Sequence, residues 1–190
     1  RQRQMCIRDR MDVPEERAEK RSLSKEDEKF LHIMRAEIKK DEGHYQLPLP
    51  FRNANISMPC NKAHAHKRLM STRKKILRDQ EFHKDYTTFM DKLFNKGYAI
   101  RSDASPKGRT WYIPHHGVRQ QKFRVFFDCA ASYQGYSLNN ELLQGPDLTN
   151  LLIGVLLRFR HNKIPFMGDI EAMFHQVRIP PEHQTFLKFF

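Results

Sequence analysis

The hydrophobic periodicity of this chain changes at Gly97, and that change limits the folds open to it. Before Gly97, apolar residues recur at three-to-four spacing, as in Phe82, Tyr86 and Phe89, which indicates helices. After Gly97, apolar residues gather in short β-branched and aromatic runs such as 122–128, which favour strands. The sequence therefore predicts an α+β fold, in which the helical pattern gives way to the first strands after Gly97.

The first helix is expected near the start of the chain. Ser24 opens a segment that resembles a capping box, and an apolar residue at every fourth position predicts an amphipathic helix over about 25–40. Gly43 is expected to end this helix. The prolines within 47–52 then enforce an extended path, which predicts a connector.

Two more helices are predicted between Lys62 and Lys96. The first, over about 62–80, is basic, and the second carries an aromatic stripe that is stopped by Lys96 and Gly97. A cationic helix face is either a solvated surface or one that follows a phosphate backbone, and the pattern leaves both interpretations open. The cations of the basic helix are Lys62, Lys67, Arg68, Arg73, Lys74, Lys75 and Arg78.

A hairpin and a further helix are expected in the second half of the chain. Residues 111–114 and 122–128 are predicted to pair as strands, joined through a basic loop at 115–118. Asp147 is the candidate N-cap of a helix whose wide apolar stripe runs over 148–159, and whose cationic end suits the helix dipole.

An apolar run stops at Asp169, and an aromatic residue, Phe174, follows five positions later. Residues 164–170 are predicted to form a short strand that delivers Asp169 at its end. Magnesium prefers hard oxygen ligands and takes only one or two protein carboxylates beside substrate phosphates, so Asp169 would supply part of a metal site. Glu171 is not the obvious second ligand, and taken alone such an aspartate is more often a turn residue or a helix cap.

Arg124 alternates with apolar neighbours in the second predicted strand. It is expected to point away from Phe123 and Val125 and to share a face with Phe126. Two interpretations stay open, an exposed strand arginine and a clamp for a triphosphate.

Two other groups of chemically active residues give weaker evidence for a functional site. Cys60, His64 and His66 have no fourth ligand nearby and open a basic helix, so a zinc site is disfavoured. His115 and His116 have no neighbouring Asp or Ser, so nothing in the sequence supports a histidine general base.

The charge balance favours a polyanionic partner. The net charge is +12 with a pI of about 9.8, which suits nucleic acid or an acidic membrane surface. Residues 1–10 have no periodicity and resemble a translated sequencing adapter, so they are interpreted as a non-native leader. Removing them takes away four Arg and one Asp, a net +3, which leaves +9.

The cysteine pattern and hydropathy bear on location. The cysteines are far apart with no CxxC spacing, which predicts a reducing compartment. No apolar run approaches membrane-spanning length and no secretory apolar core is visible. An intracellular, cytoplasmic protein without a membrane partner is therefore expected.

Four segments together carry a resemblance: 111–116, 123–128, 143–150 and 169–177. In this order their residues resemble the reverse transcriptase of BEL/Pao LTR retrotransposons. The likeness extends back to about Ser22 and covers nearly all of the chain after the leader. Several motifs in the family's order make the resemblance specific, whereas any one of them would not.

The resemblance implies a right-hand polymerase that copies RNA into DNA by two-metal catalysis with Mg²⁺. Asp169 matches the first palm aspartate, the catalytic residue that binds both ions, and the Ile170 backbone carbonyl would help to hold one of them. Phe174 matches the aromatic steric gate that excludes the 2′-OH of a ribonucleotide. Ala172 and Met173 match positions whose backbone amides face the incoming dNTP.

The resemblance also assigns a nucleotide contact to the hairpin. Arg124 matches the fingers arginine that stacks on the incoming base and grips its α-phosphate. The lysine that reaches the γ-phosphate in retroviral enzymes has no secured counterpart, although His116, Arg119 and Lys122 are near. The family's YxDD-type motif, thumb and RNase H domain are expected beyond Phe190, so this polypeptide alone is expected to be inactive.

By the same resemblance the chain divides into parts of a polymerase. These are the leader (1–10), an N-terminal helix and connector (11–61), fingers (62–140), a partial palm (141–176) and a return to the fingers (177–190). The implied partners are a primed RNA or DNA template, a dNTP and the remainder of the Pol polyprotein, and the implied location is a cytoplasmic virus-like particle.

Two other functions compete with the polymerase. One is a non-catalytic nucleic-acid-binding module that uses the hairpin and the basic helix, with contacts from Lys67, Arg68, Arg73, Lys74 and Lys75. The other is a nuclease built on Asp169 and Glu171, which predicts Mg²⁺-dependent cleavage by this chain.

Overall fold

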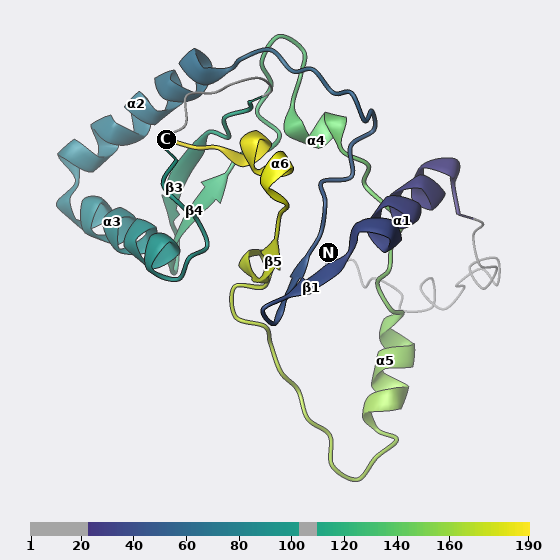
Figure 1. The fold of residues 1–190 in the computed structure, drawn as a ribbon. Coiled ribbons are helices and arrows are strands. Elements are labelled where there is room, and N and C mark those ends of the chain that lie inside the picture. The colour runs from purple at the N-terminus through teal and green to yellow at the C-terminus, as the bar shows by residue number, and fades with distance from the viewer. Residues whose placement is uncertain (1–22, 103–109) are drawn as a thin grey trace, which may run out of the picture.

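The computed structural model describes residues 23–102 and 110–190, so the leader expected over 1–10 lies outside the described residues. The fold combines helices with two small sheets; α2, α3 and one hairpin lie at one end of the molecule and α1 lies at the other (Figure 1). In chain order the elements are α1 (Lys25–Glu37), β1 (Lys39–Asp41), β2 (His44–Gln46), α2 (Lys62–Arg78), α3 (Gln80–Asn95), β3 (His115–Arg119), β4 (Phe123–Phe127), α4 (Leu138–Glu141), α5 (Leu152–Phe159), the 3₁₀ turn η3 (Met173–Gln176), β5 (Val177–Arg178), α6 (Pro181–Gln184) and η4 (Thr185–Leu187).

The N-terminal helix begins as predicted and ends earlier than predicted. Ser24 Oγ accepts from Asp27 N, and Asp27 Oδ2 accepts from Ser24 N, both at 3.1 Å, which confirms the capping box. The helix ends at Glu37, so the prediction that Gly43 ends it is wrong. Gly43 has φ +83° and turns β1 back into β2, a backbone conformation that glycine adopts without a steric penalty.

The first sheet joins the two ends of the described chain. Its order is β1-β2-β5, with β1 antiparallel and β5 parallel to β2. Arg178 of β5 donates to Asp41 at 2.9 Å and to Glu42 at 3.0 Å. The parallel pair and the ion pairs tie the segment that follows η3 to the N-terminal hairpin.

Helices α2 and α3 confirm the two helices predicted for this region. Asp79 separates them, and its Oδ1 caps α3 by accepting from Phe82 N at 2.8 Å. Gly97 ends α3 with φ +69°, and Tyr98 N donates to Leu93 O at 3.0 Å, the long hydrogen bond of a Schellman motif.

The predicted hairpin exists, but its first strand lies further along the chain. β3 pairs with β4 in antiparallel register, so 115–118 is strand and not loop. Residues 111–114 instead run beside the C-terminal segment, where Trp111 N donates to Thr185 O at 3.1 Å and Ile113 N to Lys188 O at 2.7 Å. The carbonyl acceptors of these amides lie more than 70 residues away in the sequence, and no local pattern predicts acceptors at that distance.

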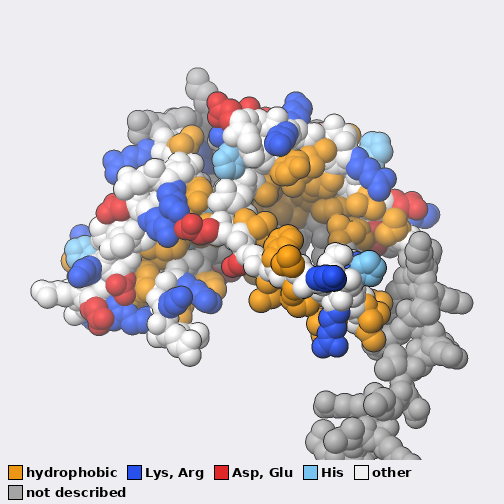
Figure 2. Space-filling view, turned by 90° about the horizontal axis from the view of Figure 1, so that it is seen from below, with side chains coloured by type: hydrophobic (Ala, Val, Ile, Leu, Met, Phe, Trp, Pro, Cys, Tyr) orange, Lys and Arg blue, Asp and Glu red, His pale blue; other side chains and the backbone are white. Residues whose placement is uncertain are grey.

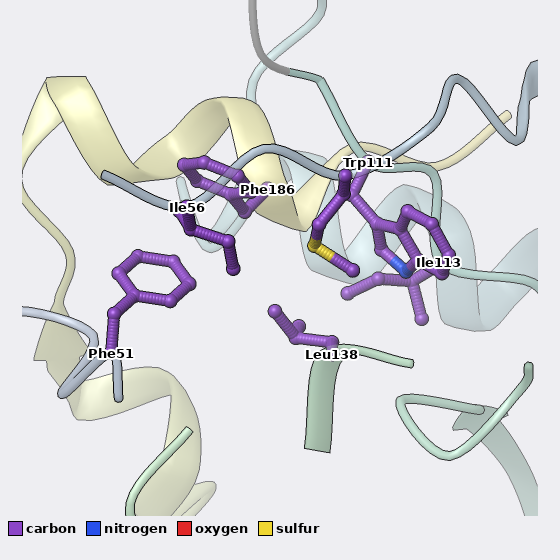
Figure 3. Close-up of a cluster of buried hydrophobic side chains, with 7 residues drawn as sticks. Phe51, Ile56, Trp111, Ile113, Leu138 and Phe186 are labelled. Atoms are coloured by element: carbon purple, nitrogen blue, oxygen red, sulfur yellow. The ribbon is translucent and has the colours of Figure 1, made fainter. Parts of the chain in front are cut away.

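The hydrophobic core lies between the connector, the segment around Trp111 and the C-terminal turns (Figure 3). The Trp111 side chain is completely buried. The residues of the core cluster are Phe51, Ile56, Met58, Trp111, Ile113, Leu138 and Phe186.

The strand predicted over 164–170 is absent. This segment is extended but pairs with no strand of the described chain, and Ile164 and Phe166 are 85% and 91% exposed. A strand needs a neighbour to satisfy its backbone, and none lies beside this one. The segment runs away from the rest of the molecule (Figure 1).

The predicted apolar helix is also shorter and more exposed than its stripe suggests. α5 begins at Leu152, and Asp147 does not cap it, because Asp147 Oδ1 instead accepts from Thr149 N at 2.9 Å. Viewed from the side on which α5 lies, the surface shows many hydrophobic side chains with Lys and Arg among them (Figure 2). No helix within the described residues has the length and apolar character needed to cross a bilayer.

A buried histidine makes the stability of this fold depend on pH. His115 is 4% exposed, and its Nε2 lies 2.6 Å from Tyr86 Oη, a hydroxyl that can donate to the neutral ring. Burial lowers the pKa of His115 to about 4, with a smaller contribution from the charge of His116, and burial raises the pKa of Tyr86 to about 12.

Because the folded pKa of His115 lies below its ordinary value of 6.5, the stabilisation is complete above about pH 7 and is lost as the pH falls towards 4. We expect the unfolding free energy to drop by about 2–3 kcal/mol between pH 7.5 and pH 4.5 from this residue. Urea unfolding at the two pH values measures the drop. His115→Phe should remove most of it, and an equal drop in that variant would contradict the assignment.

Candidate functional site

Asp169 lies in the extended segment between α5 and η3, where its side chain is exposed. Its Oδ1 accepts a hydrogen bond from Ile170 N at 3.0 Å. Within the described part of the chain, no ion pair involves this carboxylate. The carboxylate therefore remains open to a cation from solvent.

The residues after Asp169 form a tight turn with an unusual backbone. Ala172 adopts a left-handed conformation with φ +52°, and His175 N donates to Ala172 O at 2.8 Å to close η3. A non-glycine residue in this region costs about 1 kcal/mol or more, and Ala172 shares this conformation with Glu42 and Gln134. The turn leaves Phe174 86% exposed, with Met173 beside it half exposed.

Arg124 lies on β4 with the orientation that alternation predicts. Its neighbour across the hairpin is Val118, and His116 lies opposite Phe126 with ring centroids 6.1 Å apart at 24°. Because opposed residues of an antiparallel pair share a face, these four side chains lie on one face of the hairpin. The opposite face packs on α3, where Phe123 meets a buried phenylalanine.

An open pocket of about 650 Å³ lies on the same face of the hairpin as Arg124. Its lining includes His116, Phe126, Asp128 and Asn139, which places aromatic rings beside a carboxylate and an amide. Arg68 of α2 pairs with Asp128 at 2.8 Å, so the carboxylate is already neutralised from within the chain. The pocket thus presents aromatic and polar side chains together at an open surface.

The five cations proposed to contact nucleic acid fall into two groups. Arg68 is held by Asp128, and Lys75 Nζ lies 4.2 Å from the centroid of the Phe82 ring. These two are seven residues apart on α2 and so lie on the face that meets the hairpin and α3. The other three cations are exposed and form no ion pair or cation–π contact within the described residues; they are Lys67, Arg73 and Lys74.

Several predicted residues are not brought together by the fold. No hydrogen bond or ion pair joins Asp169 to Arg124 in the described chain, and no group of three potential metal ligands occurs there. His64 stacks on Tyr133 at 5.5 Å and His66 meets Phe190 edge-on at 5.4 Å, so both imidazoles pack against aromatic rings.

The sequence did not predict the contacts of Glu171 with two lysines at the end of α3. Lys96 donates to Glu171 Oε1 at 2.8 Å, and Lys92 lies 3.6 Å from the same oxygen. The hydrogen bond with Lys96 lowers the pKa of the Glu171 carboxyl, and the same bond raises the pKa of Lys96. The only sequence signal was the spacing of the two lysines, which places them on one edge of α3.

Comparison of the chain with protein-family models, curated proteins and solved structures yields no match. The interpretation of the site therefore rests on the residues themselves. They comprise an open carboxylate followed by a strained turn, an exposed aromatic ring, and an arginine beside an aromatic-lined pocket.

Proposed function

We propose that this chain is part of an RNA-directed DNA polymerase that resembles the BEL/Pao reverse transcriptases. The observation that carries the proposal is the ordered series of four motifs, which ends in Asp169 and Phe174. The exposure of both residues supports it, because a metal ligand and a sugar-contacting ring must be open to substrate. The exposed Arg124 beside an open pocket is consistent with a nucleotide contact.

The proposed reaction is attack of a primer 3′-OH on the α-phosphorus of a dNTP, with release of pyrophosphate. Asp169 is the only residue of the chain proposed as a side-chain ligand, and Mg²⁺ supplies charge neutralisation when bound. Arg124 would bind the phosphate, while Ala172 and Met173 would present backbone amides to it. Two-metal transfer needs further carboxylates, which the resemblance places in a following part of the parent protein.

Primer extension tests this function directly. The parent polypeptide, carrying the chain and the natural sequence that follows it, is expected to add dNTPs to a primed RNA template in Mg²⁺. The 190-residue chain alone is expected to add none. A parent that binds the primed template but never extends the primer would overturn the proposal.

Phe174→Val is expected to admit ribonucleotides. If the exposed ring stands beside the sugar, a smaller side chain removes the clash with the 2′-OH, so discrimination between dNTP and rNTP should fall by about 100-fold or more. The ratio of kcat/KM for dCTP and CTP measures this. Phe166→Val, the same substitution at another exposed phenylalanine to which no site role is assigned, is the control. Unchanged discrimination in the Phe174 variant would rule out the gate.

The second candidate is a nucleic-acid-binding module without catalysis. The observation in its favour is the exposed set of Lys67, Arg73 and Lys74 on α2, which a phosphate backbone would fit. Both functions predict binding that weakens with salt, so binding does not separate them. Primer extension by the parent polypeptide does, because the binding module predicts no synthesis.

A further inference from the structure

The end of α3 holds the turn that follows Asp169. His175 stacks on Tyr98 with ring centroids 4.8 Å apart at 16°, and Glu171 receives a hydrogen bond from Lys96. Gln176 Nε2 donates to the Glu171 carbonyl at 2.9 Å and lies 3.3 Å from Tyr98 Oη. Lys92 also lies 3.6 Å from Glu171, so the last turn of α3 and the residues just after it contact the turn at Glu171, His175 and Gln176.

The position of Tyr98 follows from the way α3 ends. The positive φ of Gly97 reverses the chain direction. The hydrogen bond from Tyr98 N to Leu93 O then fixes the backbone of Tyr98 against the helix. Tyr98 therefore projects from a rigid helix end and not from a free loop. Lys96 is the C-cap residue of the same helix, so both contacts come from one rigid unit.

The contacts flank the proposed site residues. Glu171 lies two positions after Asp169, and His175 lies one position after Phe174. Asp169 belongs to no strand, so its place depends on the next fixed point in the chain, which is Glu171. An exposed ion pair alone contributes little, but here it acts together with a ring stack and an amide hydrogen bond.

We propose that Lys96 and Tyr98 are positioning residues, which hold the turn 171–176 and thereby orient Asp169 and Phe174. The expected effect on catalysis rests on the proposed polymerase function. The contacts of Lys96 and Tyr98 with the turn 171–176, here called the clamp, do not rest on it. Neither residue touches substrate in this scheme. Their role is to place the carboxylate and the aromatic ring relative to the fingers helix α3.

Hydrogen exchange on this chain tests the clamp without any catalysis. Tyr98→Ala should speed exchange of amides in 170–177 by about 3- to 10-fold, because the ring stack no longer restrains the turn. Tyr98→Phe keeps the stack and should stay within twofold of the wild type. Exchange in Tyr98→Ala that matches the wild type would overturn the clamp.

A charge swap tests the ion pair in the same way. In a Lys92→Ala background, which removes the second lysine beside Glu171, Lys96→Glu should speed exchange over 170–177. Adding Glu171→Lys should restore slow exchange, since the attraction is re-formed with reversed signs. Lys84→Glu, at an exposed lysine of the same helix, makes the same change of two charge units and should leave exchange over 170–177 unchanged. A swap that fails to restore slow exchange would overturn the role of Lys96.

Kinetics of the parent polypeptide test the positioning role. Tyr98→Ala should lower kcat by roughly 10- to 100-fold at unchanged KM for the primed template, with rescue by Tyr98→Phe. A loss confined to template KM would overturn the positioning role. If the wild-type parent extends no primer, the proposed function fails and the positioning role with it, while the exchange result still decides whether the clamp exists.

Discussion

Asp169→Asn is expected to abolish DNA synthesis by the parent polypeptide, with a fall in kcat of about 10³-fold or more. Asparagine keeps the size of the side chain and one carbonyl oxygen, but it removes the negative charge that a divalent cation requires. The loss is expected in the chemical step, so KM for the primed template should remain near its wild-type value. The rate of single-turnover incorporation of one dNTP measures this loss in the chemical step.

The same substitution should leave the fold intact. Asp169 is exposed, and its one hydrogen bond within the described residues is to the adjacent Ile170 N, a bond that the asparagine oxygen also accepts. The midpoint of thermal unfolding should therefore be unchanged. Asp147→Asn is the matched control, since Asp147 is an exposed aspartate that hydrogen-bonds Thr149 outside the proposed site. Synthesis by Asp169→Asn within tenfold of the wild type would refute the metal role.

Trp111→Ala is expected to destabilise the fold by about 3–5 kcal/mol. The indole is completely buried and packs in the cluster that joins the connector to the C-terminal turns. Removing it leaves a cavity at the meeting point of segments that are distant in sequence, so the loss cannot be confined to one element. Because total stability is typically only about 5–15 kcal/mol, urea unfolding should show a large shift of the midpoint.

Trp111→Phe separates packing from the polar group of the indole. Trp111 Nε1 is buried and has no hydrogen-bond partner among the described residues. Phenylalanine retains an aromatic ring and removes this unpaired N–H, whose burial costs about 1–3 kcal/mol, so the loss should be much smaller than for alanine. An alanine variant as stable as the phenylalanine variant would contradict the packing role of the ring.

The helical half of the chain was predicted well from sequence. The capping box at Ser24, the boundary near Asp79 and the stop at Gly97 all depend on hydrogen bonds within a few residues. Local chemistry alone specifies such bonds. The predicted end of the first helix at Gly43 failed because that glycine serves a hairpin turn.

The strands were predicted less well, because pairing partners are distant. Residues 111–114 bind the C-terminal segment, so the hairpin begins at His115. Residues 164–170 have the composition of a strand but no neighbouring strand in the described chain. Composition shows that a segment can pair, and the fold decides whether it does.

For the candidate site, alternation alone determined the face on which Arg124 lies, and motif spacing alone nominated Asp169 and Phe174. Tertiary structure decided which cations are already engaged, since Arg68 is paired with Asp128, and it revealed the contacts of Tyr98 with His175 and Gln176. Side-chain direction within an element follows from backbone geometry that every residue obeys. Contacts between elements depend on packing among segments as far as 137 residues apart, and the local pattern of residues does not show which segments will meet.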